Sequence, residues 1–253
     1  MMFTNAIVRT PCKELVRALS SRGERPDYET ALRQHAQYVE TLKKCGLEVT
    51  LLDSDNRYPD STFVEDTALL TPHCAIIMNP GAPSRKGEIA GMEEALKGFF
   101  GSVEHVREPG TADGGDIVMV GTHAYIGLSR RTNAHGAQQV ISILEKYALS
   151  GSTVTVEKVL HLKSGVSCLG NNDLVASGEF VQNPEFRKFK ILNVADDESY
   201  AANCVWINGN VLIPKGYPKA TKMIEKAGYE TIEIDVSEFR KVDGGISCLS
   251  LRF

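Results

Sequence analysis

The sequence predicts an α/β fold in which five pseudo-symmetric ββαβ units form a propeller-like ring, in a single domain spanning residues 1–253. Two observations predict it. A module of two apolar strands around a tight turn, an amphipathic helix and an alternating strand recurs along the chain. The two terminal segments together supply one more such module. Pairing of the chain ends would therefore close the ring and leave few exposed sheet edges.

Four complete modules follow one another from residue 63. Their first strands are expected at 63–70, 114–120, 165–170 and 203–207, and their second strands at 74–80, 124–128, 174–180 and 211–216. Their last strands, rich in Val, Ile and Thr, are expected at 102–106, 152–157, 191–194 and 229–235. The Asn208-Gly209 dipeptide is the strongest hairpin signal, because it suits the turn between two antiparallel strands.

Apolar periodicity predicts the helix of each module. In the first module, four apolar residues after Ser84 fall on one helical face: Ile89, Met92, Leu96 and Phe99. Helices are also expected over 132–147 and 218–224, and a short segment opened by Pro184 takes this place in the third module. The fifth module is split, with strands at 244–253 and 3–10, a helix over 28–45 and a strand over 47–53.

Composition excludes several classes of protein. The net charge is -4 at pH 7, and no block of basic residues with interleaved aromatic residues is present, so we expect no nucleic-acid partner. The first residues lack a secretory signal pattern, and no apolar run has membrane-spanning length, so we expect a cytoplasmic protein without a membrane partner. The six cysteines are widely scattered, which predicts free thiols and no metal site.

In such a ring, equivalent strand starts face the same end of the central axis. The residues at these starts are Val64-Glu65-Asp66, Gly115-Asp116, Ser167-Cys168, Asn203-Cys204 and Ser247-Cys248. We therefore expect an axial pocket that combines thiols with carboxylates. Two glycines precede Cys248 and would leave open space beside its sulfur, as a nucleophile requires. Cys168 lies in a similar strand and remains a rival nucleophile.

Clustered carboxylates at Glu65 and Asp66 favour a planar guanidinium, whose N–H groups match paired carboxylate oxygens. Attack on its carbon calls for a thiolate and for protonation of the departing amine. His161 follows an apolar stretch and precedes a strand start, so it is a candidate general acid. Asp113 is placed to fix the imidazole tautomer, although aspartate is also common in turns such as this one.

Arg85 and Arg131 occupy equivalent places in adjacent modules, where the second strand turns into the helix. Two arginines so placed are expected to bind the carboxylate of an elongated substrate. An amino acid that carries a guanidinium satisfies both ends of this site. The polar, glycine-containing segment 20–26 is either a lid over the pocket or a plain connection.

The motifs together resemble a known family. They are IVRTPCKELV, YPDSTFVEDTALL, PGAPSRKGE, TADGGDIVMVG, YIGLSRRTNAHG, EKVLHLKSG, ESYAANCVWIN and KVDGGISCLSLRF. They resemble the bacterial dimethylarginine dimethylaminohydrolases (dimethylargininases) of the guanidine-modifying superfamily, whose pentein fold is a ring of five pseudo-symmetric ββαβ units. The likeness covers essentially the whole chain, and its PDSxFVED, HLK and GGxSCxSLRF motifs are highly specific.

The resemblance implies hydrolysis of N-ω-methylated arginines to citrulline through a thiouronium on Cys248, with His161 as proton donor and Asp113 as its partner. It implies no metal or cofactor, a small-molecule substrate as partner, and leaves a homodimer open. The implied substrate-binding residues are Leu19, Asp60, Glu65, Asp66, Arg85, Arg131 and the Val242 backbone. Some bacterial relatives carry glutamate where Asp113 stands, and Asp116 is a second candidate for its role.

Two alternatives remain, one within the same superfamily and one from a different class of protein. An arginine deiminase or another guanidine hydrolase would use the same cysteine, histidine and carboxylate, although this chain lacks the extra helical insertion of arginine deiminases. A catalytically silent ring that only binds a partner is the second alternative, and the joint presence of Cys248, His161 and the acidic residues weighs against it.

Overall fold

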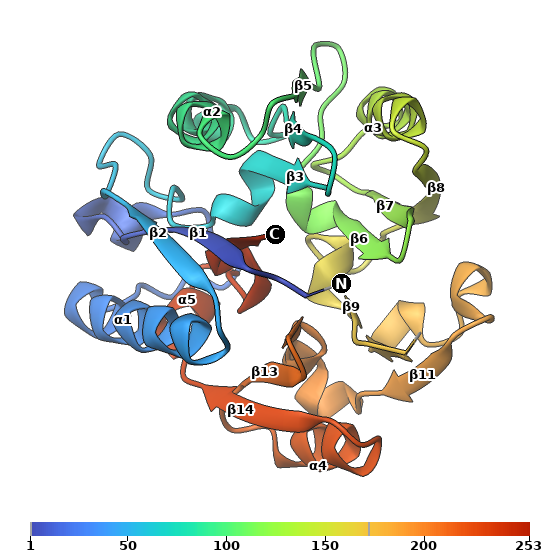
Figure 1. Cartoon of the computed structure of the whole chain (residues 1–253). Helices are drawn as coiled ribbons and strands as arrows, with labels where there is room; N and C mark the ends of the chain where they lie inside the picture. The colour runs from blue at the N-terminus through green and yellow to red at the C-terminus, as the bar shows by residue number, and fades with distance from the viewer. Residues whose placement is uncertain (1, 172) are drawn as a thin grey trace.

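A computed structural model describes residues 2–171 and 173–253. Within them the strands form five three-stranded sheets, placed as five units around a central axis (Figure 1). The strands are β1 (Asn5–Arg9), β2 (Glu48–Leu52), β3 (Ala68–Leu70), β4 (Ala75–Ile77), β5 (Val103–His105), β6 (Ile117–Val120), β7 (His123–Leu128), β8 (Ser150–Thr155), β9 (Val166–Cys168), β10 (Asp173–Ala176), β11 (Lys190–Asn193), β12 (Val205–Ile207), β13 (Asn210–Pro214), β14 (Glu230–Ile234) and β15 (Leu251–Arg252).

All five sheets share one topology. Their strand orders are β15-β1-β2, β3-β4-β5, β6-β7-β8, β9-β10-β11 and β12-β13-β14. In each sheet the first pair of strands is antiparallel and the second pair is parallel. The repeated ββαβ module predicted from the sequence is therefore confirmed.

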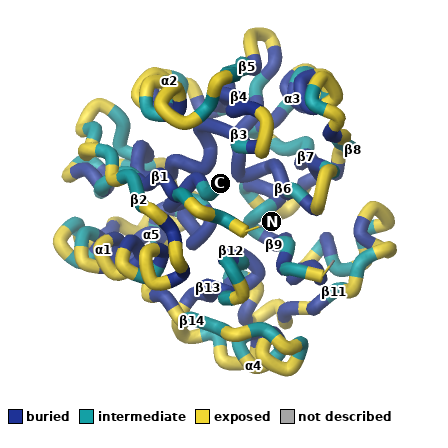
Figure 2. Tube along the Cα trace, in the orientation of Figure 1, coloured by how far each residue is buried: buried dark blue, intermediate teal, exposed yellow. Residues whose placement is uncertain are grey.

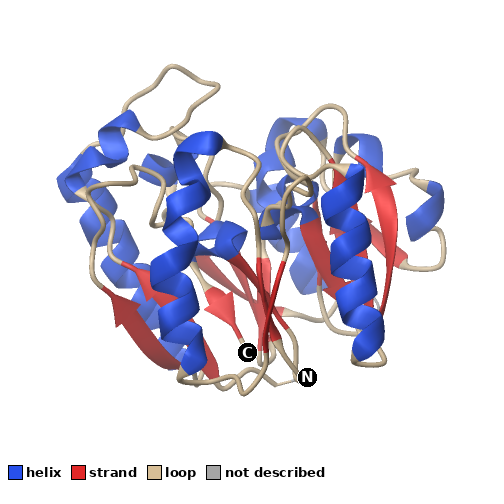
Figure 3. Cartoon of the chain, turned by 90° about the horizontal axis from the view of Figure 1, so that it is seen from above, coloured by secondary structure: helices blue, strands red, loops and turns tan. Residues whose placement is uncertain are grey.

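The chain ends close the ring. Ala6 pairs with Arg252 and Ile7 pairs with Leu251, so β1 and β15 form the antiparallel pair of the split unit. The backbone amide of Thr4 also donates to the Phe253 carbonyl at 2.9 Å. Seen along the axis and from the side, the two termini lie close together near the axis (Figures 1 and 3). The predicted pairing of the termini is confirmed.

Helices connect the second and third strands of four units and lie on the outside of the ring (Figure 1). They are α1 (Tyr28–Lys44), α2 (Ile89–Lys97), α3 (Ala134–Lys146) and α4 (Pro218–Lys226), and a single-turn helix, α5 (Ser237–Arg240), follows β14. In the third unit two short 3-10 turns, Gly178–Phe180 and Pro184–Phe186, take the place of the helix. The short segment opened by Pro184 agrees with the prediction, whereas residues 178–180 were expected to continue the second strand, which ends at Ala176. Exposed residues gather on the helices, while the strands around the axis are mostly buried (Figure 2).

The core lies between neighbouring units. On α1, Tyr38 and Leu42 are fully buried and belong to one apolar cluster with Ile207 and Leu212 of the preceding unit. The helix of one unit thus covers the sheet of the preceding unit. Phe99 departs from expectation, because α2 ends at Lys97. The Phe99 side chain is 45 % exposed and contacts the ring of Phe253 edge-on, with centroids 5.2 Å apart.

The first residues of the segments predicted as first strands form 3-10 turns in most units instead. A 3-10 turn precedes the first strand of each unit: η2 (Val64–Thr67), η4 (Gly114–Asp116), η5 (Leu162–Ser164), η8 (Asp196–Ala202) and η9 (Ser247–Leu249). In a strand, neighbouring side chains point to opposite faces. In the turn, Glu65 and Asp66 both reach partners around the axis, so the turns carry the polar residues that the strands could not present together.

No helix in the described part of the chain is both long enough and apolar enough to cross a membrane.

Candidate active site

A cavity of about 560 Å³ opens beside the ring axis. Cys248, His161 and Glu65 line it, although Glu65 and Cys248 are 183 positions apart in the sequence. Ser21 and Arg22 from the predicted lid also line it. The structure therefore brings together the thiol, the imidazole and one carboxylate that the sequence analysis selected.

Cys248 lies in the turn η9, with its backbone amide 3.2 Å from the Gly245 carbonyl. The Gly245 amide in turn donates to the Cys248 sulfur at 3.4 Å. Burial, together with the negative charges of Glu65 and Asp66, raises the pKa of the Cys248 thiol to about 12. In the absence of a bound cation the side chain is therefore a neutral thiol at pH 7.

The glycines before Cys248 have a different role from the expected one. A Cβ on Gly244 would lie 2.3 Å from the ring of Phe63, and one on Gly245 would lie 2.4 Å from Oδ1 of Asn203. Protein side chains occupy this space, so the glycines admit Phe63 and Asn203 rather than clearing room for a substrate. The open space expected beside the sulfur is nevertheless present, because Gly245 and Cys248 both line the cavity.

Cys168 does not occupy a position equivalent to Cys248. It lies within β9, and its thiol donates to the Leu169 carbonyl at 3.1 Å. It lines a second, smaller cavity of about 180 Å³, which shares Glu65 and Lys163 with the first. Burial and the nearby Asp173 raise the pKa of the Cys168 thiol to about 11. The expected equivalence failed because the turn of this unit ends at Ser164 and Cys168 lies in the strand after it, whereas Cys248 lies within the turn of its own unit.

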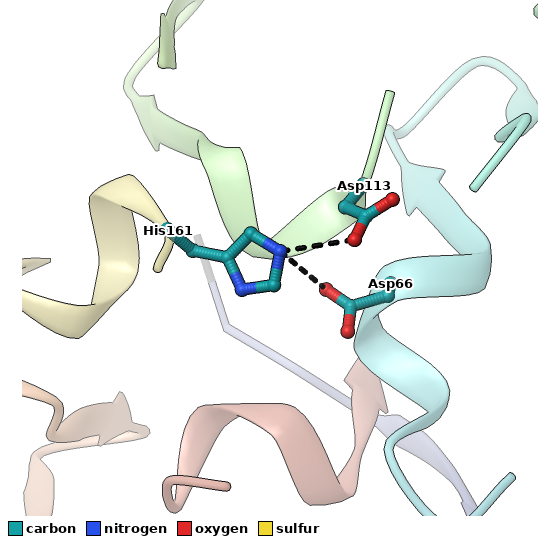
Figure 4. A group of neighbouring side chains, drawn as sticks. All are labelled: Asp66, Asp113 and His161. Carbon is teal, nitrogen blue, oxygen red and sulfur yellow. Dashed lines mark hydrogen bonds and ion pairs between the residues drawn. The ribbon is translucent and has the colours of Figure 1, made fainter. Parts of the chain in front are cut away.

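His161 is buried and immediately precedes the turn η5. Its Nε2 lies 3.0 Å from Asp113 Oδ2 and 3.9 Å from Asp66 Oδ1, between the two carboxylates (Figure 4). Burial opposes the charged imidazole, but the carboxylates of Asp66, Asp116 and Asp113 outweigh it and raise the His161 pKa to about 9. At pH 7 the ring is therefore an imidazolium, the form that can donate a proton.

Asp113, not Asp116, is the carboxylate hydrogen-bonded to the His161 ring. The Asp116 carboxylate accepts hydrogen bonds from Ser129 Oγ at 2.6 Å, Thr132 Oγ1 at 2.7 Å and the Leu162 amide at 3.0 Å. These three donors hold it away from the imidazole nitrogen. Asp116 thus supports the backbone beside His161, and its charge reaches the ring only through space.

Glu65 is held by partners that the sequence analysis missed. Its carboxylate accepts from Lys163 Nζ at 2.8 Å, Arg252 Nη2 at 3.2 Å and Ser247 Oγ at 2.6 Å. Lys163 stands in the HLK motif and Arg252 in the SLRF motif, so both lay within sequences that carried the resemblance. Their contacts appear only when the units meet at the axis.

The two arginines predicted to bind the substrate carboxylate lie next to the cluster formed by His161, Asp66 and Asp113. Arg85 is buried and bound to Asp66 and to Glu88, the latter at 2.8 Å. Arg131 Nη1 lies 3.4 Å from Asp113 Oδ2, at the edge of the same cluster. Glu88 was not anticipated, and burial raises its pKa to about 7 against the opposing effect of Arg85.

The loops that carry the two arginines are in contact. A Cβ on Gly81 would lie 2.2 Å from the Arg131 carbonyl oxygen, so only glycine permits this approach. The Gly81 amide also donates to Asp113 Oδ1 at 2.8 Å. The equivalent placement of the arginines in adjacent units therefore corresponds to real proximity.

The segment that contains the predicted lid folds over the cavity. The Leu19 amide donates to Asp60 Oδ1 at 3.1 Å, and Ser20 Oγ donates to the Lys241 carbonyl at 2.7 Å. Arg22 Nε lies 3.5 Å from Asp243. Asp60 is buried, and burial raises its pKa.

Val242 adjoins this contact region. Its side chain is buried in the apolar cluster of Phe63 and Leu249, and its amide donates to the Phe239 carbonyl at 3.1 Å. Leu19 and Val242 therefore lie at the lid end of the site, and Asp60 joins that end to Arg85, whose Nη2 donates to the Asp60 carbonyl at 3.4 Å.

Asp66, Asp113 and His161 place one potential metal ligand each within 4.8 Å of one another. Arg85 pairs with Asp66, and Arg131 pairs with Asp113, so each carboxylate already has a cationic side chain as its partner. The arrangement therefore matches a buried ion-pair cluster that orients His161 better than it matches a metal centre.

Comparison with known proteins places this geometry in a family. The model of the family described as N,N dimethylarginine dimethylhydrolase, eukaryotic, matches residues 13–251. An N(G),N(G)-dimethylarginine dimethylaminohydrolase of Pseudomonas aeruginosa is 54% identical over 254 residues, covering 100% of both chains. One from Streptomyces coelicolor is 37% identical over 251 residues, covering 98% of this chain and 96% of that protein.

Comparison with solved structures gives the same family as the comparison of sequences. A cysteine-to-serine variant of the Pseudomonas aeruginosa enzyme, in complex with citrulline, superposes with a TM-score of 0.99 at 53% identity over the whole of both chains. The N-terminal domain of a cyanobacterial arginine dihydrolase shares the fold alone, with a TM-score of 0.87 at 17% identity, covering 98% of this chain and 97% of that one. On the strength of its sequence, its fold and the arrangement of its axial site, this chain belongs to the dimethylarginine dimethylaminohydrolase family.

Proposed function

We propose that this protein hydrolyses N-ω-methylated arginines to citrulline and the corresponding methylamine or dimethylamine. One observation carries the proposal: a single axial cavity holds a thiol, an imidazole charged at neutral pH and a buried carboxylate. A guanidinium is the ligand that this combination suits, because it is planar and cationic and carries an amine that can leave once protonated.

We assign residues to the charged groups of the substrate by their opposite charge. Glu65 and Asp66 bind the guanidinium, since both are buried carboxylates at the axis. Arg131 and Arg85 bind the substrate carboxylate, and Arg131 is the more available of the two because Arg85 shares its N–H groups with Asp66 and Glu88. Asp60 and the Val242 backbone, at the lid end, bind the substrate amino group, and Leu19 covers it.

The resting thiol becomes reactive when the substrate arrives. Burial and the charges of Glu65 and Asp66 raise the Cys248 pKa, and the guanidinium charge opposes that of the two carboxylates, so binding lowers this pKa and releases the thiol proton. The Cys248 sulfur then bonds to the guanidinium carbon. The tetrahedral adduct collapses as His161 gives its proton to the methylated nitrogen, the C–N bond breaks and the amine leaves.

In the second half of the reaction His161 accepts a proton instead of donating one. Neutral His161 takes a proton from water, whose oxygen bonds to the carbon of the thiouronium. Collapse of this second adduct breaks the C–S bond, and the proton of its hydroxyl group passes to the departing sulfur, which restores the thiol and releases citrulline. Asp113 holds the ring through Nε2 during both steps, which leaves Nδ1 as the nitrogen that exchanges the proton.

The deciding experiment incubates the purified protein separately with asymmetric dimethylarginine, monomethylarginine and arginine, and follows citrulline colorimetrically. We expect citrulline from both methylated substrates and much less from arginine. Turnover of arginine alone would instead identify an arginine deiminase. Absence of product from all three would identify a ring that binds without catalysis.

A further inference from the structure

The side chain of Asn203 contacts two loops of the candidate site at once. It lies at the end of the turn η8, in the fourth unit, and is buried. Its Nδ2 donates to the Lys163 carbonyl at 2.9 Å and to Ser247 Oγ at 2.9 Å, and its Oδ1 accepts from the Ser247 amide at 3.0 Å. Lys163 follows His161 by two positions, and Ser247 immediately precedes Cys248.

These contacts define the orientation of the amide. If the oxygen and nitrogen of Asn203 were exchanged, the NH2 group would face the Ser247 N–H and the oxygen would face the Lys163 carbonyl. Two donors and two acceptors would then oppose each other in a buried place, which is costly. An amide is therefore the group this position requires, because it offers two donors and an acceptor in one plane.

The network continues from Asn203 to the guanidinium site. Ser247 Oγ accepts from Asn203 and donates to Glu65 Oε2 at 2.6 Å. One side chain thus connects the loop of the general acid, the turn of the nucleophile and, through one hydroxyl, the carboxylate assigned to the substrate. Asn203 borders the cavity, but all three hydrogen bonds of its amide are made to protein groups, so the amide acts through its neighbours.

Close packing adds a second constraint. Asn203 occupies the space beside Gly245, where a Cβ would lie 2.4 Å from its Oδ1. The Gly245 amide is the donor to the Cys248 sulfur at 3.4 Å. A shift of Asn203 would therefore move the Gly245 amide and the Ser247 backbone together, within the three residues that precede the nucleophile.

We propose that Asn203 is a positioning residue that sets the distance between Cys248 and His161 and holds the sulfur in its turn. The proposal deepens the proposed function and rests on it. Because small misplacements of reacting groups slow catalysis strongly, loss of the amide should reduce kcat while substrate binding changes little.

The test compares N203D and N203S with a matched control, N208D. Asn208 also makes three amide hydrogen bonds, to the Phe3 amide, the Phe3 carbonyl and the Cys45 carbonyl, and none of these residues lines the axial cavity. We expect both variants at 203 to lower kcat by about tenfold or more with KM changed less than about threefold, and N208D to retain kcat. All variants are first checked for folding by thermal denaturation and circular dichroism.

Alkylation by iodoacetamide, resolved by peptide mass spectrometry, supplies a readout independent of turnover. In N203S we expect Cys248 to react at least about threefold faster relative to Cys168, because the turn around the sulfur has lost its support. Slower turnover with a more reactive thiol is the signature of lost positioning. Cys168 serves as the internal reference because it lies in the other cavity.

Several outcomes would overturn the proposal. They are a kcat of N203S within about threefold of the parent, an equal loss in N208D, an unchanged alkylation ratio, or failure of both variants at 203 to fold while N208D folds. Absence of citrulline from the parent protein would instead overturn the proposed function, and the alkylation ratio would still decide the role of Asn203.

Discussion

Asp113 Oδ2 lies 3.0 Å from His161 Nε2, and the two residues come from different units of the ring. The contact ties the ring of the proposed general acid to a carboxylate that is itself held by the Gly81 amide. The imidazole is thereby fixed in one plane and one tautomer, with its other nitrogen left for proton transfer.

This contact predicts a large loss of kcat for one substitution at Asp113 and a small loss for another. D113N removes the charge that orients and stabilises the imidazolium, and we expect kcat to fall by about a hundredfold. D113E retains the carboxylate on a longer side chain, and we expect it to keep kcat within roughly tenfold of the parent. Steady-state kinetics with dimethylarginine measure both, and equal activity of D113N and the parent would contradict the role of Asp113.

The pH dependence of kcat/KM follows from the pKa values of Cys248 and His161 in the free protein. The resting pair is a thiol and an imidazolium, with pKa values of about 12 for Cys248 and about 9 for His161. The reactive pair, thiolate and imidazolium, holds one proton fewer than the resting pair. We therefore expect kcat/KM to rise about tenfold per pH unit at neutral pH and to level near pH 9.

Proton release measured in a weakly buffered solution provides the matching check. Substrate binding at pH 7 should release close to one proton per site, because the bound guanidinium favours the thiolate. The variant C248S should release none. A pH profile of kcat/KM that is flat between pH 6 and 9 would show that the thiolate already exists before binding.

Substitution of the two cavity cysteines distinguishes the nucleophile. C248A should reduce citrulline formation by about ten-thousandfold, because no other group at the site forms the thiouronium. C168A should leave kcat within about threefold, because Cys168 lines the other cavity. Mass spectrometry of the protein quenched during turnover should show the covalent intermediate on the peptide of Cys248. The same adduct on Cys168 would contradict the assignment.

Arg131 should affect binding more than chemistry. R131A removes a cation proposed to bind the substrate carboxylate, and we expect KM to rise roughly tenfold to a hundredfold with kcat changed only a few fold. Methylguanidine, which lacks a carboxylate, supplies the control. Its kcat/KM should be low with the parent protein and almost unaffected by R131A. A similar loss with both substrates would show that Arg131 acts through Asp113 instead.

The order of strands and helices could be predicted because each unit carries its own pattern. The antiparallel and parallel pairs of all five sheets agree with the repeated module, and the short third connection agrees with the Pro184 signal. The 3-10 turns before the first strands were not predicted. Their sequences, such as Val64-Glu65-Asp66-Thr67, adjoin apolar strand residues, and periodicity alone does not separate a turn of four residues from the strand that follows it.

The sequence by itself determined the ring and named the thiol, the imidazole and the acidic pair, since apolar periodicity and motif identity are local properties of the chain. Only the tertiary structure decided which aspartate bonds the imidazole, which cysteine shares its cavity, and that Lys163 and Arg252 hold Glu65. Those choices depend on distances across the axis between units far apart in sequence, and such distances are established only when the five sheets pack together.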